Sequence, residues 1–333
     1  MRAATVQRLE HLESMVPSLT TIKLARLGSF TVGGRRIEIA DKPSEEVRLS
    51  RDLRYTRDPN GAYAIEQAYV QYFVPDGATS FPIVLVHGGG MTGACWETTP
   101  DGREGWLQQI LRAGHPTYVI DNVERGRAGW CPFPEVWSEQ AQMRSERDVW
   151  SFFRFGHPAD YERRAPFAGA AFPVEFLAEL TRQQVPRWTT TTDQSINAMT
   201  DLLHRVGPCA VVAHSQGSGI AATAAAMLPG LVHSMVLIEP SGLPDTPAPV
   251  PNQCRQLIVG GDYIERSPVW SNMEQRWIAY VDKLRTASIS AEYLSLPAAG
   301  HRGNSHIPMS DRNSDVIAAA IEDWMTLTDG GIA

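Results

Sequence analysis

Hydrophobic positions follow two alternating spacings along the chain from Phe81 onwards. Residues 81–90, FPIVLVHGGG, form an unbroken apolar run that ends in glycines, as is typical of a strand covered on both faces. Similar runs predict further strands at 116–123, 208–215, 233–240, 255–262 and 291–300. Apolar residues at helical spacing predict helices at about 102–113, 193–206, 217–230, 273–284 and 316–325. This alternation predicts an α/β fold with a mostly parallel, doubly wound sheet and a site at the carboxyl ends of its strands.

The first 80 residues have a different, β-rich pattern. The stretch FTVGGRRIEI at 30–39 consists of two short β-like runs around Gly33 and Gly34, which predicts a hairpin turn there. Residues 62–75 alternate apolar and polar positions until a proline ends the run. We therefore expect residues 1–80 to form a β-rich N-terminal part of the same domain.

The alternation of strands and helices stops between residues 129 and 192, where the chain is dense in Trp, Phe, Pro and Arg. A structureless loop of this length is uncommon inside a compact domain, so the segment should have structure of its own. We expect residues 129–192 to be an inserted lid or cap, and residues 1–128 and 193–333 to form the core. The alternative is a second packing layer that does not touch substrate.

The side chains of this segment allow two readings. Its aromatic residues suggest an apolar acyl or alcohol group in the substrate, but they can equally form the core of the lid. They are Trp130, Phe133, Trp137, Trp150, Phe152, Phe153 and Phe155. Its arginines could bind a carboxylate, but such residues more often form a solvated face. They are Arg144, Arg147, Arg154, Arg163 and Arg164.

Composition excludes several classes of partner. The 30 Lys and Arg residues against 37 Asp and Glu give a net charge of −7 without a basic cluster, so we expect no nucleic-acid partner. No apolar run approaches the roughly 20 residues of a membrane span. The N-terminal residues are too charged for a signal sequence, so a cytoplasmic location is expected. The four widely spaced cysteines should be free thiols.

The stretch VVAHSQGSG at 211–219 carries the strongest chemical signal. A serine between small residues, at a sharp turn from a strand into a helix, is the geometry of an exposed nucleophile. Ser215 has Ala213 and Gly217 two residues away on either side, so G-x-S-x-G appears here with Ala in first place. Ser218 is the rival candidate, but it should lie inside the helix. We therefore expect Ser215 to be the nucleophile.

A serine nucleophile also needs a base and an acid, which should come from other strand ends. After the last strand, His301 and His306 are both candidates for the base, and the pattern does not separate them. Asp262 and Glu239 are the candidates for the acid. Glu239 is favoured because a carboxylate at the end of a buried strand needs a hydrogen bond or a charge to offset its desolvation.

The HGGG stretch at 87–90 is the candidate oxyanion loop, since glycines let backbone N–H groups approach a carbonyl oxygen closely. Gly89 is the first choice, together with the N–H of Gln216, and Gly90 is the second. Candidate substrate contacts are His87, His214, Trp130 and Phe153. The two histidines have structural alternatives, because His87 could brace the loop and His214 could point away from the serine.

With these features the chain resembles the α/β-hydrolase family over about residues 81–325. A narrower resemblance is to bacterial and fungal serine esterases whose acid is a Glu after the sixth strand. It rests on MTGACWETTPDGREGW, FRFG, AHSQ, IEP, GDYIE, and GNSH followed by DRN. The resemblance implies a triad of Ser215 as nucleophile, His306 as base and Glu239 as orienting acid, with Gly89 and Gln216 as oxyanion donors.

The resulting prediction is a serine esterase that cleaves a small, fairly apolar ester or lactone through an acyl-enzyme. It needs no cofactor and no metal, and a homodimer is left open. The alternatives are a lyase or cyclase on the same fold, an amide or carbon–carbon bond hydrolase, and a noncatalytic binding module. These differ in whether a serine-directed reagent labels the protein and whether an acyl-enzyme forms.

Overall fold

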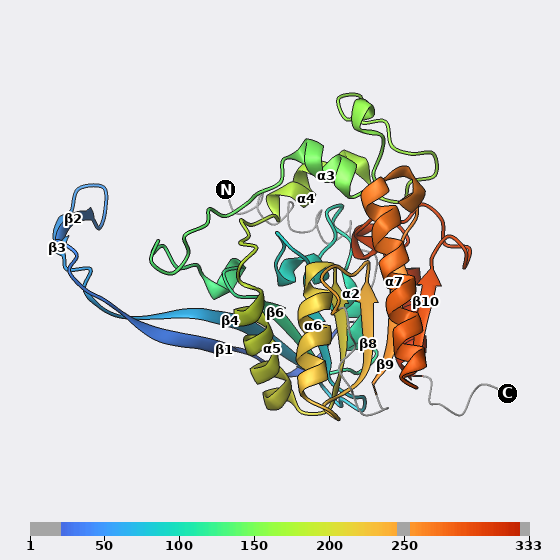
Figure 1. Cartoon of the computed structure of the whole chain (residues 1–333), viewed down its shortest axis with the longest axis horizontal. Coiled ribbons are helices and arrows are strands. Elements are labelled where there is room, and N and C mark those ends of the chain that lie inside the picture. The colour runs from blue at the N-terminus through green and yellow to red at the C-terminus, as the bar shows by residue number, and fades with distance from the viewer. Residues whose placement is uncertain (1–20, 245–253, 327–333) are drawn as a thin grey trace, which may run out of the picture.

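The computed structural model describes residues 21–244 and 254–326 (Figure 1). An eight-stranded sheet has the order β1-β4-β6-β5-β7-β8-β9-β10, and β2 pairs with β3 separately. The strands are β1 Leu24–Ile39, β2 Glu45–Arg48, β3 Arg54–Arg57, β4 Gly61–Pro75, β5 Ile83–Val86, β6 Thr117–Asp121, β7 Cys209–His214, β8 Val232–Ile238, β9 Arg255–Gly260 and β10 Ala291–Ser295. The α-helices are α2 Trp106–Arg112, α3 Glu146–Phe152, α4 Leu177–Arg182, α5 Thr192–Val206, α6 Gln216–Met227, α7 Pro268–Thr286 and α8 Ser314–Thr326.

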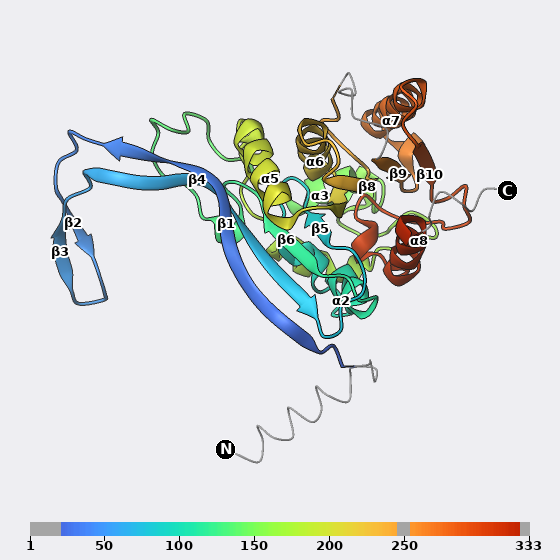
Figure 2. The same cartoon turned by 90° about the horizontal axis from the view of Figure 1, so that it is seen from below.

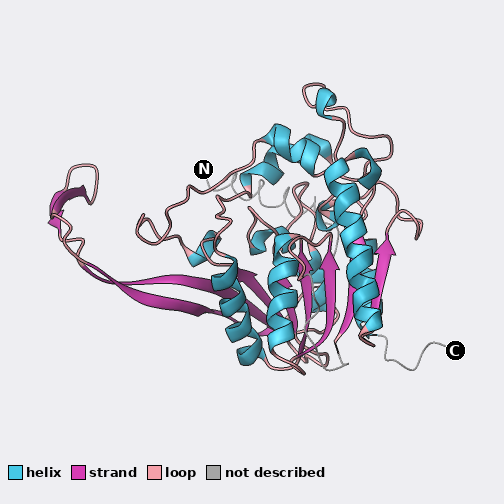
Figure 3. Ribbon diagram, viewed as in Figure 1, coloured by secondary structure: helices cyan, strands magenta, loops and turns pink. Residues whose placement is uncertain are grey.

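Strands β6, β5, β7, β8, β9 and β10 are parallel to one another. β4 runs antiparallel to β6, and β1 runs antiparallel to β4. Successive residues of the buried strands belong to two different apolar layers. Val84 and Val86 pack in the layer with α5, α6 and α7, whereas Ile83 and Leu85 pack in the layer with α2 and α8. Figure 3 shows the helices against the strands of this sheet. The prediction of an α/β fold with a mostly parallel, doubly wound sheet is confirmed.

The expected hairpin turn at Gly33 and Gly34 is wrong. β1 runs through both glycines without interruption and pairs with β4 on either side of them, from Val32 opposite Ala68 to Arg35 opposite Ile65. Both glycines have positive φ, 66° and 87°. A Cβ on Gly33 would lie 2.8 Å from the Cβ of Ala198 in α5. Gly33 therefore marks a place where a helix closely approaches the strand, which a sequence pattern does not distinguish from a turn.

β1 and β4 form a long ribbon that extends away from the body of the molecule, with β2 and β3 at its far end (Figures 1 and 2). The sequences of β2 and β3, EEVR and RYTR, gave no strand prediction because they lack an apolar face. Ion pairs across the two strands join Glu45 to Arg57 and Glu46 to Arg54. Exposed pairs of this kind contribute little stability each.

Residues 129–192 include α3 and α4, which lie beyond the carboxyl ends of the parallel strands, above them in Figure 1. Trp150, Phe155 and Phe172 are buried, and the rings of the last two stack with centroids 4.0 Å apart. All three belong to the same apolar layer as strand residues of the sheet. These aromatic side chains therefore pack the segment onto the core.

The four cysteines are buried free thiols, as expected. None of the helices in the described ranges combines the length and the apolar character needed to cross a membrane.

Candidate functional site

Ser215 occupies the sharp turn between β7 and α6. Its φ of 50° and ψ of −119° are rarely adopted by a residue with a side chain, and such strain persists only where the surroundings enforce it. The N–H of Ser215 donates to the carbonyl of Ile238 at 2.9 Å, which ties the turn to β8. A Cβ on Gly217 would collide with the carbonyl oxygen of His87. The small residue two positions after the serine is therefore required by packing against the neighbouring loop.

Ser218, the rival candidate for the nucleophile, is buried and its hydroxyl already has a hydrogen-bond partner. Ser218 lies in the first turn of α6, and its hydroxyl donates to the carbonyl of Ala213 at 3.0 Å. Ser215 Oγ instead lies 3.2 Å from Nε2 of His306.

His306 links Ser215 to Glu239. Nδ1 of His306 lies 2.6 Å from Oε2 of Glu239, which is the first residue after β8 and is fully buried. An ionised carboxylate can only accept, so Nδ1 carries the proton and Nε2 is left to accept the serine hydroxyl. The other oxygen, Oε1, accepts the N–H of Gly261 at 2.7 Å. The structure thus joins Ser215, His306 and Glu239 in one chain of hydrogen bonds.

The alternative acid has a different role in the structure. Asp262 accepts the N–H of Tyr263 at 2.7 Å and the N–H of Gly303 at 2.8 Å. Its carboxylate therefore connects the loops after β9 and β10 instead of contacting the histidine. The sequence left His301 and His306 open as the base, and the structure places His306 against Ser215.

Arg154 is a site residue whose position the sequence analysis did not foresee. Its guanidinium forms a two-point ion pair with Glu239, with Nη1 to Oε2 at 2.9 Å and a second contact from Nη2 to Oε1. Nε donates to the carbonyl of Asp262 at 2.8 Å, and the guanidinium carbon lies 4.7 Å from the ring centroid of Trp270. In the sequence, FRFG gave only an arginine in an aromatic stretch, without a sign that this arginine is buried.

The ion pair determines the charge of Glu239. Complete burial opposes ionisation of the carboxyl, but the charge of Arg154 and the hydrogen bond from His306 outweigh it. Together they lower the pKa of Glu239 to about 2. Glu239 is therefore a carboxylate throughout the neutral range.

Aromatic rings enclose His306. Its ring centroid lies 5.1 Å from that of Phe153 and 4.4 Å from that of Trp270. Burial lowers the pKa of His306 below its usual value of 6.5, although Glu239 acts in the opposite direction. The imidazole is consequently neutral at pH 7, as a proton acceptor must be.

The loop that carries His306 is held by Asp311. Its carboxylate accepts the N–H of Ser305 at 2.7 Å, the hydroxyl of Ser305 at 2.8 Å and the amide of Asn304 at 3.0 Å. All of these groups are buried. The DRN stretch thus fixes the two residues that precede the histidine.

His87 and His214 were candidate substrate contacts, but the structure encloses both of them. Nδ1 of His87 donates to the Gly88 carbonyl at 2.8 Å, and Nε2 accepts the N–H of Asn122 at 3.0 Å. Nε2 of His214 donates to the carbonyl of His306 at 2.9 Å. Burial lowers the pKa values to about 4 for His87 and about 3 for His214. These contacts correspond to the structural alternatives: His87 braces its loop, and His214 supports the backbone of His306.

The candidate oxyanion loop lies against the serine turn. A Cβ on Gly88 would be 2.5 Å from Nδ1 of His214 and 3.1 Å from the Cβ of Ser215. A Cβ on Gly89 would be 2.7 Å from Oε1 of Gln216 and would collide with Nη1 of Arg187. At Gly88 a side chain would collide with the His214 ring beside the serine, whereas at Gly89 it would displace the ends of the Arg187 and Gln216 side chains.

Two cavities adjoin this region. The smaller one, about 130 Å³, is lined by residues that include Gly89, Gly90 and Phe153. The larger one, about 520 Å³, is lined by Trp130 and Trp188, among others, and Val185 lines both. Phe153 lines the smaller pocket and lies against the His306 ring, and its expected contact with substrate stays a prediction.

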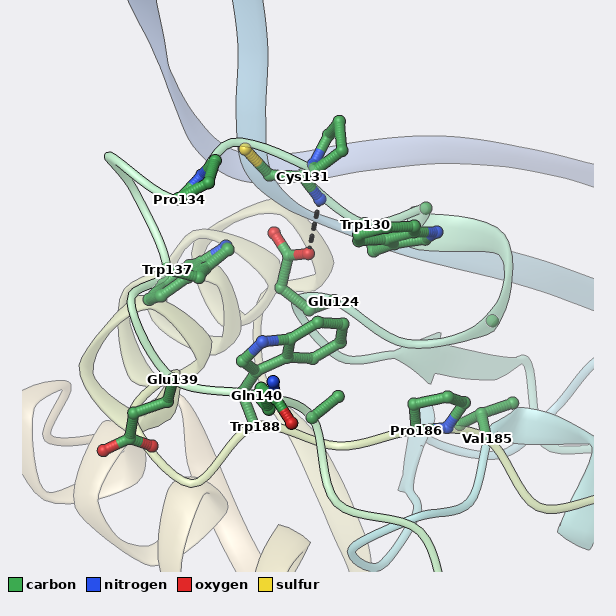
Figure 4. A pocket seen from close by; sticks show the side chains of 14 residues that line it. Glu124, Trp130, Cys131, Pro134, Trp137, Glu139, Gln140, Val185, Pro186 and Trp188 are labelled. Atoms are coloured by element: carbon green, nitrogen blue, oxygen red, sulfur yellow. Dashed lines mark hydrogen bonds between the residues drawn. The ribbon is translucent and has the colours of Figure 1, made fainter.

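Trp130 does not line the smaller pocket. It is 64% exposed and stacks on Trp188 with ring centroids 6.0 Å apart. Figure 4 shows these rings with Trp137 around the carboxylate of Glu124, which accepts the N–H of Cys131 at 2.6 Å. Burial raises the pKa of Glu124. The expected substrate contact at Trp130 thus belongs to a separate aromatic cavity.

Residues 83–328 match the model of the alpha/beta hydrolase family. The chain is 33% identical to the protein in the solved structure of a bacterial esterase, over 93% of this chain and 98% of that one, with a TM-score of 0.78. It is also 32% identical, over 191 residues, to a fungal protein (Fungal sp., strain ATCC 74256) called "Probable secreted lipase phiG". That match covers 55% of this chain and 52% of the relative, so the chain spans about half the length of this curated relative. The chain belongs to the α/β hydrolase family.

Proposed function

We propose that this protein is a serine hydrolase that cleaves a carboxylic ester or lactone through an acyl-enzyme. The observation that carries the proposal is the chain of hydrogen bonds from Ser215 through His306 to Glu239. The names of the two relatives, an esterase and a lipase, support ester hydrolysis in general. The cytoplasmic location expected from the sequence stays a prediction, since the fungal relative is described as secreted.

In the proposed mechanism, His306 Nε2 removes the hydroxyl proton of Ser215 while Oγ attacks the ester carbonyl. The carbonyl π electrons move to the oxygen, giving a tetrahedral oxyanion. As the intermediate collapses, His306 returns the proton to the leaving alcohol and the acyl group stays on Ser215. Water then repeats both steps on the acyl-enzyme and releases the acid. Glu239 holds Nδ1 protonated and stabilises the imidazolium that forms in each step.

The oxyanion is proposed to bind backbone N–H groups of Gly89 and Gln216, with Gly90 as the second choice in its loop. Gln216 is the first residue of α6, so its N–H has no partner four residues earlier in a helix. The positive end of the helix dipole also favours negative charge there. Each donor of this kind contributes about 3 kcal/mol to lowering the barrier.

The segment at 129–192 is proposed to act as the lid. Phe153 is the first residue after α3. It contacts the His306 ring and lines the smaller pocket. The adjacent aromatic cavity, which shares Val185 with this pocket, supports a substrate with an apolar group.

A direct test is turnover of para-nitrophenyl esters of increasing acyl length by the parent and by Ser215→Ala. The proposal predicts hydrolysis by the parent and loss of at least about 10³-fold in kcat for the variant, because the covalent route is removed. Ser218→Ala is the matched control, since it removes a serine hydroxyl from the first turn of the helix that follows Ser215 without touching His306. Equal loss in both variants, or undiminished turnover by Ser215→Ala, would contradict the assignment.

A further inference from the structure

Arg187 has no carboxylate partner among the described residues, unlike the other arginines of the 129–192 segment. The other arginines of the 129–192 segment each form an ion pair. The pairs are Arg144–Asp148, Arg147–Glu162, Arg154–Glu239, Arg163–Asp160, Arg164–Glu146 and Arg182–Glu179. The guanidinium of Arg187 makes neither an ion pair nor a hydrogen bond within residues 21–244 and 254–326. A partly buried guanidinium without a protein acceptor keeps its donors available to an incoming anion.

The backbone holds Arg187 at the smaller pocket. Its N–H donates to the carbonyl of Gln142 at 2.9 Å, and its carbonyl accepts the N–H of Gln142 at 2.7 Å. Pro186 and Trp188 line the aromatic cavity, whereas Arg187 lines the smaller pocket together with Gly89. Nη1 lies so close to Gly89 that a Cβ there would collide with it. The charge is therefore next to the loop that is proposed to bind the ester carbonyl.

The groups around Arg187 favour binding of an anion, because positive charges lie near it and no unpaired carboxylate of the described residues lines the pocket. Burial and the neighbouring charge of Arg144 lower the pKa of Arg187. The neighbouring Arg125 is buried, and within the described residues its guanidinium bonds only to carbonyl oxygens, including that of Trp188 at 3.1 Å. Asp148 is the one carboxylate among the residues that line this pocket, and it is paired with Arg144.

The pocket contains a second unused donor. Gln184 lines it, and its Nε2 is buried without a hydrogen-bond partner in the described structure. A buried amide donor left unpaired costs free energy in the empty state, and an incoming acceptor removes that cost. Arg187 and Gln184 both line this small space, so their guanidinium and amide are the donors nearest to an anion bound there.

We propose that the substrate is an ester that carries a carboxylate, which pairs with Arg187 and accepts from Gln184 in the smaller pocket. The planar guanidinium matches a planar carboxylate at two points, and a volume of about 130 Å³ suits a carboxylate with a short carbon chain. This inference rests on the proposed ester hydrolysis at Ser215. The aromatic cavity then takes the apolar part of the same substrate.

The test compares pairs of esters that differ in one charge. Para-nitrophenyl hydrogen adipate against methyl para-nitrophenyl adipate places the carboxylate in the acyl group. Para-acetoxybenzoate against methyl para-acetoxybenzoate places it in the leaving group. The parent is expected to prefer the charged member of at least one pair by roughly 10- to 100-fold in kcat/KM, as for a hydrogen bond to a charged group. The preference should weaken as ionic strength rises.

Substitution of Arg187 isolates its contribution. Arg187→Met should remove most of the preference and Arg187→Lys should keep part of it, because lysine retains the charge without the planar fork. Arg182→Met is the matched control, since Arg182 is an exposed arginine of the same segment that does not line either cavity, and it should keep the full preference.

Three outcomes have distinct meanings. Equal rates for both members of both pairs in the parent would overturn the carboxylate assignment while leaving ester hydrolysis intact. Equal losses for charged and neutral esters in Arg187→Met would instead place its charge at the carbonyl oxygen, which also overturns the assignment. Failure of the proposed function would differ from both, because the parent would then turn over no ester.

Binding without turnover gives an independent measurement. Calorimetric titration of Ser215→Ala with the adipate monoester should give a Kd roughly tenfold or more below that of the Ser215→Ala/Arg187→Met double variant. Equal affinities in the two proteins would contradict the proposed contact.

Discussion

Arg154 and Glu239 form a buried two-point ion pair in which both side chains are at most 1% exposed. The carboxylate that holds His306 is therefore itself held by a residue of the 129–192 segment. This contact connects the segment above the sheet with the charge at the site. It also means that a change to Arg154 acts on the chemistry through Glu239 and His306.

Arg154→Met should leave Glu239 buried without its main counter-charge. Breaking such a pair typically costs about 3–5 kcal/mol, which urea unfolding would measure. The pKa values of Glu239 and His306 should both rise, because the Arg154 charge lowers each of them. The acid limb of kcat/KM should accordingly move to higher pH. In Arg154→Lys, which keeps the positive charge, this shift should be smaller. Lost stability with an unmoved acid limb would reduce Arg154 to a packing role.

Glu239→Gln should lower kcat by roughly 10³–10⁴-fold, because the amide no longer fixes Nδ1 protonated. Asp262→Asn is the comparison. Its effect on kcat should be small because, in the part of the chain that the structure describes, the Asp262 carboxylate bonds only to backbone N–H groups of neighbouring loops. Steady-state kinetics on one para-nitrophenyl ester, with circular dichroism to verify folding, measures both. A severe loss in Asp262→Asn with a mild one in Glu239→Gln would move the acid to the later strand.

His306→Ala should abolish acylation, whereas His301→Ala should not. The reason is that only His306 of the two contacts Ser215. Rapid-mixing measurement of the first released nitrophenolate reports acylation directly. If both variants kept the same residual rate, the assignment of His306 as the base would fail.

The pH dependence of kcat/KM should follow deprotonation of His306. Its pKa is lowered below 6.5, so activity should rise with pH through a midpoint below 6.5 and be constant at neutral pH. Glu239 raises the pKa of His306, so the residual activity of Glu239→Gln should have its midpoint at still lower pH. A parent profile with a midpoint well above 6.5 would show that another group controls the rate.

Stability should also depend on Glu239 at acid pH. Its folded-state pKa of about 2 is below the ordinary value of about 4.3. Glu239 therefore contributes fully to the free energy of unfolding when the pH is above its ordinary pKa. This contribution is lost as pH falls towards 2. Urea unfolding from pH 6 to 3 should show a steeper decline for the parent than for Glu239→Gln.

The sequence pattern predicted those strands and helices whose burial follows from the spacing of apolar residues along the chain. The buried strands and the helices α5, α6 and α8 all appear close to their predicted positions because apolar periodicity reports burial directly. The glycines at 33 and 34 were misleading because what they accommodate is far away in sequence: Ala198 of α5 at Gly33, and residues 65 and 67 of the paired strand β4 at Gly34. The charged strands β2 and β3 gave no apolar pattern to detect.

The same holds for the site: residues marked by their local sequence context could be predicted, and residues defined by distant contacts could not. Ser215 is marked by its strand–turn–helix context, and the position of Glu239 by its place at a buried strand end. Arg154 and Arg187 could not be separated from surface arginines, because what distinguishes them is a partner across the fold or the lack of one. Long-range pairing of this kind leaves no spacing in the sequence.

The central claim is that Ser215 forms a covalent acyl-enzyme. The most direct measurement is the intact mass of the parent and of Ser215→Ala after treatment with a fluorophosphonate. We predict one adduct per parent chain and none on Ser215→Ala, with Ser218→Ala labelled like the parent. An unlabelled parent, or an adduct that persists in Ser215→Ala, would contradict the account.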